Sequence, residues 1–364
     1  MGSGPRAYLT QTMGGRKPAS VDDDVTLSRV RATLESMSRC APFLCVLALG
    51  ACEPDGTTRP PSRVASAELA TAPSADGEPG HAPVEASAAG RVEAPAAERS
   101  LSLDDYPWHA DDSVEALVAV DHLEDRFAPP DGYARVALAP DSFGAWLRRL
   151  PLAAAGTPVL AHDGRTILPE GHTNLAAVTT LDVGPRDLQQ CADAIMRLFG
   201  EWRWSRGEAR AVSFQSGFGA IPWTRFLGGE IPHYDGDRVH WITARRRAGE
   251  DHPSFRRYMD VVFTWANTGS LARQASTPSA DDLRPGDFFI LPGNPGHTVL
   301  VLDLARDDTG RRVALIGQSF MPAQRFQVLR PSRSRAWFTI DDDGVHTPFW
   351  RPFPWSSLRR LDGP

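Results

Sequence analysis

Residues 284–303 read RPGDFFILPGNPGHTVLVLD, and this stretch decides the fold that we predict. It contains two apolar runs, Phe288–Leu291 and Thr298–Leu302, with a loop of Gly, Pro and Asn between them. Short apolar runs bounded by such turn-forming residues are typical of β-strands. We therefore predict two consecutive strands of one sheet, with His297 at the start of the second.

The remaining sequence after residue 100 divides into helical and strand-like parts. Apolar residues recur at helical spacing after Asp187 and after Pro253, and a shorter helix is predicted after Asp141. Asp187 and Gln190 form a pair that resembles a capping box, so the clearest helix is expected to begin at Asp187. The further predicted strands are 157–160, 175–181, 313–316 and 326–329.

Helices followed by an antiparallel sheet predict the α+β class, in a single domain that spans residues 101–364. The chain has 364 residues, with 39 Lys and Arg against 45 Asp and Glu, which gives a formal net charge of -6. A mildly acidic chain is a poor candidate for nucleic-acid binding, which normally uses a basic face. No run of about eighteen or more apolar residues occurs, so no membrane-spanning helix is expected.

Residues 37–52, MSRCAPFLCVLALGAC, have the pattern of an export signal: one positive charge, a short apolar run and small residues. The ending Leu-Gly-Ala-Cys resembles a bacterial lipobox, which implies that Cys52 is lipidated and that translation starts near Met37. A buried apolar helix is the alternative interpretation. We predict a signal region at 1–52 and an exported lipoprotein held at the periplasmic face, with Glu53 favouring the outer membrane.

Residues 53–100 consist largely of Ala, Pro, Ser, Gly, Thr and Glu, with very few large apolar side chains. Such a segment cannot bury enough surface to offset the entropy of ordering it. We predict a disordered tether here, so function is expected to reside in residues 101–364.

Cys191 is the residue with the clearest potential for chemistry. The first two cysteines leave with the signal and Cys52 takes the lipid, so Cys191 would be the one free thiol of the exported domain. Near a helix start the N–H groups favour a thiolate, and Gln189 could donate to an oxyanion. Because Cys191 also shares an apolar stripe with Ile195, an ordinary core cysteine is an equally open interpretation.

His297 and Gln318 are the candidate partners of Cys191. His297 opens a strand after the Gly- and Pro-rich loop, where its imidazole could take a proton from a helix-borne thiol. Gln318 ends the next strand and could orient the imidazole, as the third member of a catalytic triad does. A half-buried histidine at a strand end is the alternative.

The chain order of Cys191, His297 and Gln318 resembles that of papain-like cysteine peptidases. The segment from Gly286 to His297 also resembles NlpC/P60 and CHAP cell-wall amidases. These resemblances imply a papain-like fold, with N-terminal helices and a C-terminal antiparallel sheet, and hydrolysis of peptide-like envelope substrates.

A closer resemblance covers most of residues 125–360. The blocks DLQQCADAIMRL (187–198), PGH (295–297) and QSFMPAQ (318–324), with TPFW at 347–350, look like those of DUF4846, a family of largely exported bacterial proteins. The family implies no activity, but Cys191, His297 and Gln318 all fall inside these blocks.

The other polar motifs predict no cofactor and no metal site. The remaining histidines lack the spacing of zinc ligands, although a metal site assembled from distant residues is an alternative. Asp341–Asp343 predicts an acidic solvated turn, and Arg245–Arg247 predicts a solvated loop. Trp223 and Asn294 are candidates for lining a substrate groove, with aromatic core as the alternative for Trp223.

Two hypotheses of different class follow. In the first, a monomeric, lipid-anchored cysteine peptidase or amidase acts on peptide-like or cell-wall substrates through Cys191, His297, Gln318 and Gln189. In the second, the domain is a non-catalytic binding or assembly module of the envelope, with Cys191 in its core. The second hypothesis predicts a buried sulfur atom, and the first predicts an accessible thiol.

Overall fold

The computed structural model describes residues 101–362. The predicted signal region with Cys52 and the predicted tether (53–100) lie outside the described residues, so both stay predictions. Within residues 101–362 no helix is long and apolar enough to cross a membrane.

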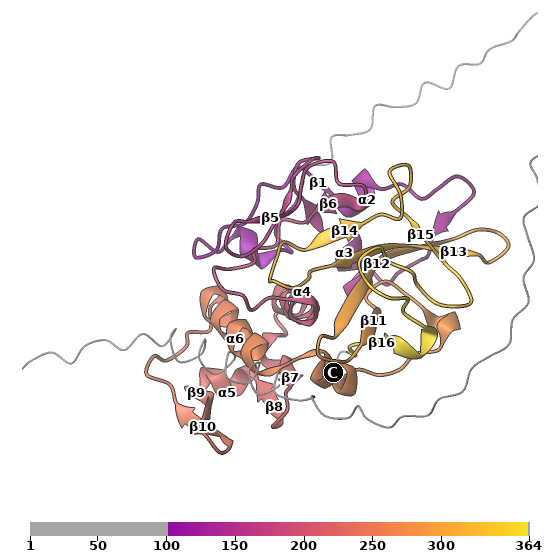
Figure 1. Cartoon of the computed structure of the whole chain (residues 1–364). Helices are drawn as coiled ribbons and strands as arrows, with labels where there is room; N and C mark the ends of the chain where they lie inside the picture. Colours follow the sequence, from indigo (N-terminus) through magenta and orange to yellow (C-terminus); the bar gives the residue numbers. More distant parts are fainter. Residues whose placement is uncertain (1–100, 363–364) are drawn as a thin grey trace, which may run out of the picture. The chain divides into compact units, whose positions relative to one another are not determined.

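An eight-stranded antiparallel sheet forms the centre of the described domain (Figure 1). Its strands run in the order β16-β11-β12-β13-β14-β6, while β2 and β15 pair with the ends of β12 and β13 that meet at their connecting turn. The strands are β2 (Ala134–Arg135), β6 (Leu175–Val178), β11 (Phe288–Leu291), β12 (His297–Arg306), β13 (Arg312–Gln318), β14 (Gln327–Leu329), β15 (Phe338–Ile340) and β16 (Leu358–Arg359).

Helices and small two-stranded ribbons surround this sheet. The helices are α2 (Leu123–Arg126), α3 (Phe143–Arg148), α4 (Cys191–Ser205), α5 (Trp223–Leu227), α6 (His252–Trp265) and α7 (Thr268–Gln274). The ribbons are β1 (Asp121–His122) with β3 (Pro151–Leu152), β4 (Val159–Leu160) with β5 (Thr166–Leu168), β7 (Ser213–Gln215) with β8 (Ala220–Pro222), and β9 (Glu230–Tyr234) with β10 (Val239–Thr243). Short 3-10 turns lie at Pro107–His109, Ala209–Ala211, Ala280–Asp282 and Trp355–Ser357.

The two faces of the sheet are covered by different parts of the chain, because successive side chains of a strand point to opposite faces. On the helix-covered face, α3 and α4 pack over β12 (Figure 1). The strand residues of this face include Phe288, Ile290, Leu300, Leu302 and Leu315. The other face, which we call the C-terminal face, is closed by the segment that contains Val345, Phe353 and Leu358. Its strand residues include Phe289, Val299, Val301 and Ile316.

The α+β class is confirmed as a mixture of helices with a largely antiparallel sheet. The strand Phe288–Leu291 is found as predicted, and the next strand begins at His297, one residue before its apolar run. The sheet is not purely C-terminal, however, because β6 and β2 join it from the first half of the domain.

The predicted start of the clearest helix at Asp187 is wrong. The helix begins at Cys191, and its capping box is formed by Gln190 and Asp193. The Asp187 carboxylate instead accepts a hydrogen bond from the backbone N–H of Ala323 at 2.7 Å. The Asp187 carboxylate, which we expected to cap the helix, therefore joins two distant parts of the chain.

Candidate functional site

Cys191 is a buried thiol at the first position of α4, with 5% of its surface exposed. Its Sγ donates a weak hydrogen bond to the carbonyl oxygen of Gly296 at 3.8 Å. Burial, reinforced by the charge of Asp193, raises the pKa of Cys191 to about 12. The backbone N–H groups near the sulfur favour the thiolate, but burial outweighs them. Cys191 is therefore a neutral thiol near pH 7.

His297 and Gln318 do form the contact that the sequence predicts. His297 Nε2 lies 2.9 Å from Gln318 Oε1, and since this oxygen can only accept, Nε2 carries the proton. His297 Nδ1 is buried and has no hydrogen-bond partner among residues 101–362. Burial lowers the pKa of His297 to about 4, although the Gln318 contact opposes this. The imidazole is thus neutral near pH 7, with an unused acceptor at Nδ1.

The Cys191 sulfur lies against the backbone of Gly296 and Thr298, whereas the His297 ring between them turns towards the C-terminal face. α4 packs on the helix-covered face, to which Leu300 points. His297 alternates to the C-terminal face, where its ring centroid lies 6.1 Å from that of Phe353. Within residues 101–362 no hydrogen bond joins Cys191 Sγ to a ring nitrogen of His297. The structure therefore brings His297 and Gln318 together without Cys191, and the catalytic role of Cys191 stays a prediction.

The other predicted site residues lie apart from the thiol. Gln189 donates from Nε2 to the carbonyl oxygen of Asp182 at 2.8 Å and accepts from Arg197 at 3.1 Å, so its amide is committed to these partners. Trp223 is 0% exposed, so it belongs to the aromatic core and does not line a groove. Asn294 is exposed on the loop between β11 and β12.

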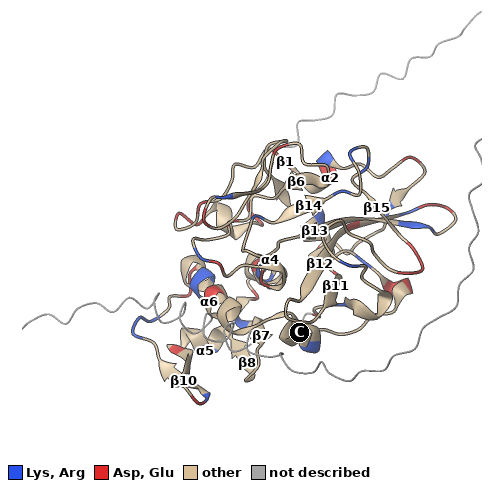
Figure 2. Cartoon of the chain, viewed as in Figure 1, with Lys and Arg blue, Asp and Glu red and all other residues tan. Residues whose placement is uncertain are grey.

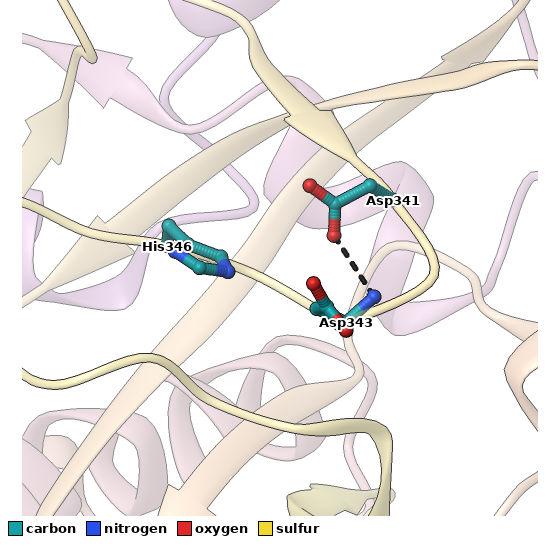
Figure 3. Close-up of side chains that lie close together, drawn as sticks. All are labelled: Asp341, Asp343 and His346. Atoms are coloured by element: carbon teal, nitrogen blue, oxygen red, sulfur yellow. Dashed lines mark hydrogen bonds between the residues drawn. The ribbon is translucent and has the colours of Figure 1, made fainter.

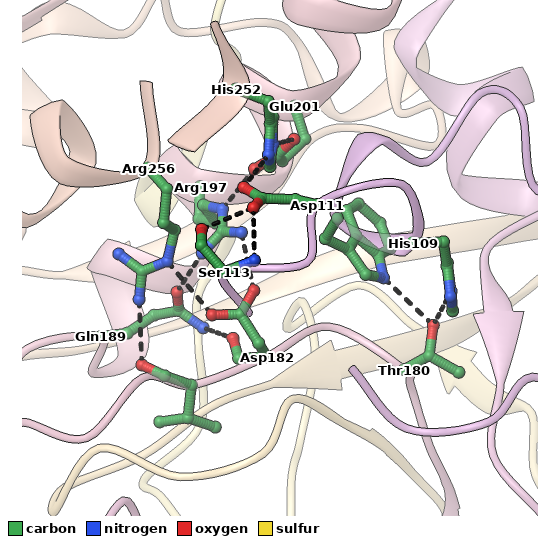
Figure 4. A network of polar contacts seen from close by, with 12 residues as sticks. His109, Asp111, Ser113, Thr180, Asp182, Gln189, Arg197, Glu201, His252 and Arg256 are labelled. Atoms are coloured by element: carbon green, nitrogen blue, oxygen red, sulfur yellow. Dashed lines mark hydrogen bonds and ion pairs between the residues drawn. The ribbon is translucent and has the colours of Figure 1, made fainter. Parts of the chain in front are cut away.

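A buried network of charged side chains lies between α4 and α6, and sequence reasoning missed it (Figure 4). His252 Nδ1 is 2.6 Å from Asp111 Oδ2, and Nε2 is 2.8 Å from Glu201 Oε2. Arg197 pairs with two of the carboxylates: its Nε lies 2.5 Å from Glu201 Oε1, and its Nη2 lies 2.7 Å from Asp182 Oδ1. The i,i+4 spacing of Arg197 and Glu201 within a mostly buried helix was the one signal available.

The network sets the charges of its members. Burial alone would lower the pKa of His252, but hydrogen bonds and charges from Glu201 and Asp111 raise it above its usual value. Burial of Asp182 is likewise opposed by Arg197 and by Arg256 at 3.1 Å, which hold the pKa of this carboxyl far below its usual range. The two carboxylates on either side of His252 thus favour its protonated form.

Two surface cavities flank the network and share the lining residues Ser113 and Pro253. The first, of about 850 Å³, is lined by His252, Trp204 and the acidic residues Asp104, Asp111 and Asp112. The second, of about 860 Å³, is lined by Arg246, Arg256, Arg257 and Arg325 among others. Both volumes fall in the range of roughly 300–1,000 Å³ that is typical of small-molecule sites.

Asp341, Asp343 and His346 form a cluster whose ligand atoms lie within 4.8 Å of one another (Figure 3). All three residues are exposed, and the backbone N–H of Asp343 donates to Asp341 Oδ1 at 3.0 Å. The structure thus shows the exposed acidic turn that the sequence predicts.

These features define an α+β domain with a central antiparallel sheet, a buried charge network and two charged cavities. The chain belongs to the family described as domain of unknown function (4846), which matches residues 123–360. The family resemblance drawn from the sequence blocks is thereby confirmed. No curated protein and no solved structure matches the chain.

Proposed function

We propose that the protein is a lipid-anchored, non-catalytic binding or assembly module of the cell envelope. The observation that carries this proposal is the placement of Cys191, the one cysteine among the described residues. A nucleophilic cysteine must be exposed to its substrate and close to its base. Cys191 is buried and has a raised pKa, and in the described part of the chain its sulfur forms no hydrogen bond with the His297 ring.

The cellular location in this proposal rests on the N-terminal sequence. The Leu-Gly-Ala-Cys segment ending at Cys52 would place the lipid, and residues 53–100 would tether the folded domain to the outer membrane. A single folded domain on a long tether can reach ligands or partners at a distance from the bilayer, as a binding module requires.

A papain-like cysteine peptidase or amidase is the second candidate, and the contact between His297 and Gln318 favours it. In that function Cys191 would attack a peptide-like carbonyl after His297 takes its proton, and Gln318 would hold the ring. The His297 imidazole would first have to leave its aromatic surroundings. Its ring centroid lies 4.6 Å from that of Phe320 and 4.9 Å from that of Trp350. That requirement makes it the weaker of the two proposals.

Thiol labelling separates the two functions. The measurement is the pH dependence of iodoacetamide alkylation of Cys191 in the full chain, followed by mass mapping of its peptide so that the other cysteines do not interfere. We expect modification only after denaturation, in both the native protein and a His297→Ala variant. Rapid labelling at neutral pH that collapses in His297→Ala would overturn the binding proposal and support a thiolate–imidazolium pair.

A further inference from the structure

The second cavity, which we call the arginine cavity, is built from segments far apart in the sequence. Residues 113–117 and 181–185 line it together with the start of α6. Arg246 enters from the loop between β10 and α6, which Figure 2 shows as a run of positive charge, and Arg325 enters from the segment before β14. The arginines therefore converge through folding rather than through local sequence.

One side of the arginine cavity is electrostatically balanced. Arg256 forms ion pairs with Asp182 at 3.1 Å and with Asp260 at 2.5 Å. Asp260 also accepts from Arg186 at 2.5 Å, and Asp182 accepts from Arg197. These acidic groups are thus occupied and do not neutralise the other arginines of the cavity.

The three remaining arginines, Arg246, Arg257 and Arg325, form no ion pair with any group in the described part of the chain. Arg257 donates to the carbonyl oxygen of Pro253 and to Ser254 Oγ. Among the lining residues, the only other carboxylate is that of Glu115, which is exposed. Three guanidinium groups therefore face one free carboxylate around a single cavity.

Arg325 shows most clearly that this arrangement lacks a counter-ion. It is partly buried and donates to the carbonyl oxygen of Pro158 at 3.2 Å. Burial lowers the pKa of Arg325 from its usual value, and attraction by Glu115 only partly opposes this. A partly desolvated cation without a carboxylate at ion-pair distance is unfavourable, and a bound anion would relieve the cost.

We propose that the arginine cavity binds a small molecule with several oxyanion groups, carboxylate or phosphate, through Arg246, Arg257 and Arg325. This inference rests on the proposed binding function and names the chemical class of its ligand. The planar guanidinium fork matches both groups and can bind each through two parallel hydrogen bonds. The volume of about 860 Å³ accommodates a molecule much larger than one anion.

Calorimetric titration of the full chain tests the proposal with three probes. Tricarballylate presents three carboxylates, its tricarboxamide has the same shape without charge, and tripolyphosphate presents phosphates. We expect at least one of the two anions to bind and the tricarboxamide not to bind. Binding by tricarballylate alone would identify carboxylate as the group recognised, and binding by tripolyphosphate alone would identify phosphate.

The decisive variant is Arg257→Gln combined with Arg325→Gln, which should weaken anion binding about tenfold or more. The matched control is Arg333→Gln combined with Arg351→Gln. It removes the same charge from exposed positions outside the cavity, and should leave binding within about twofold. Equal weakening in both variants, binding of the tricarboxamide, or no binding of either anion would overturn the proposal.

The failure of this inference can be told apart from a failure of the proposed function. A reactive Cys191 in a protein that still binds the anion would refute the non-catalytic function and leave the ligand class standing. An unreactive Cys191 in a protein that binds neither anion would refute the ligand class alone.

Discussion

His252 and His297 are both buried, yet their surroundings shift their pKa values in opposite directions. His252 lies between the carboxylates of Asp111 and Glu201, and its pKa is raised. His297 lies among aromatic rings with one neutral partner, Gln318, and its pKa is lowered to about 4. Burial has the same sign at both sites, so the counter-charges alone produce the difference.

The comparison shows which kind of buried polar group each region can support. The His252 region combines several charges of both signs that satisfy one another, beside two open cavities. The His297 region holds one neutral ring in an apolar environment, and among the described residues no cation or carboxylate contributes to its electrostatics. General acid–base catalysis needs a base whose pKa lies near the operating pH. The His297 region is therefore poorly suited to general base catalysis at neutral pH.

The largest effect is expected from breaking the charge network. In Arg197→Met, Asp182 and Glu201 lose a fully buried partner, and the free energy of unfolding should fall by about 3–5 kcal/mol. Urea unfolding at pH 7 measures this loss. The matched control is Arg210→Met, which removes an exposed pair with Glu250 and should leave the free energy of unfolding nearly unchanged.

If Arg197→Met lowered the free energy of unfolding no more than Arg210→Met does, the network would contribute as little to stability as exposed ion pairs do. The contrast with the His297 region would then disappear, because both regions would depend on apolar packing alone.

The second prediction concerns the dependence of stability on pH, which should have opposite signs at the two histidines. Since the folded pKa of His297 is about 4, the unfolded chain binds its proton more readily, and stability falls as the pH drops from about 6.5 towards 4. Once the pH is below the folded pKa, the contribution of His297 to the free energy of unfolding has decreased by about 3 kcal/mol. His252 has a raised pKa, so its contribution is present below about pH 6.5 and is lost as the pH rises through the folded value.

Unfolding free energies of the native protein, His297→Asn and His252→Asn between pH 4 and 9 measure both trends. The advantage of the native protein over His297→Asn should shrink at acid pH, and its advantage over His252→Asn should shrink at alkaline pH. Two parallel curves would contradict the opposite pKa shifts of the two histidines.

Much of this architecture follows from local sequence, but the comparison itself does not. The apolar run Phe288–Leu291 is bounded by turn residues and specifies its strand directly. Because side chains alternate between the two faces of a sheet along each strand, His297 and Thr298 must point to opposite faces. Where the start of α4 meets β12 is decided by packing between segments about a hundred residues apart, so the sequence could not predict that the Cys191 thiol and the His297 ring form no hydrogen bond in the described residues.

The charge network was hidden for the same reason. Asp111 and His252 are 141 positions apart, and neither belongs to a motif. The contact between His297 and Gln318 was predictable because both residues lie at the ends of neighbouring strands. Asp187 misled the prediction of the helix start because a capping residue and a tertiary acceptor have the same local sequence.

The third prediction tests the core role of Cys191. Cys191→Ser buries a hydroxyl, which costs more to desolvate than a thiol, and should reduce the free energy of unfolding by about 1–3 kcal/mol. Cys191→Ala is the control, because it removes the sulfur without adding a polar group and should cost less than the serine variant. Full native stability of Cys191→Ser would instead indicate a solvated position and weaken the binding proposal.

The smallest effect is expected from the cap of α6, the helix that carries His252. Asp251 accepts a hydrogen bond from the backbone N–H of Ser254 at 2.8 Å, and Asp251→Ala should cost about 1 kcal/mol of stability. Asp251→Asn, which keeps an acceptor, is the control and should lose less. The His252 imidazole signal followed by NMR should still titrate above its ordinary pKa in Asp251→Ala, because Glu201 and Asp111 are untouched. A return of the His252 pKa to its ordinary value would mean that the local helix end, rather than the buried network, sets the charge of this histidine.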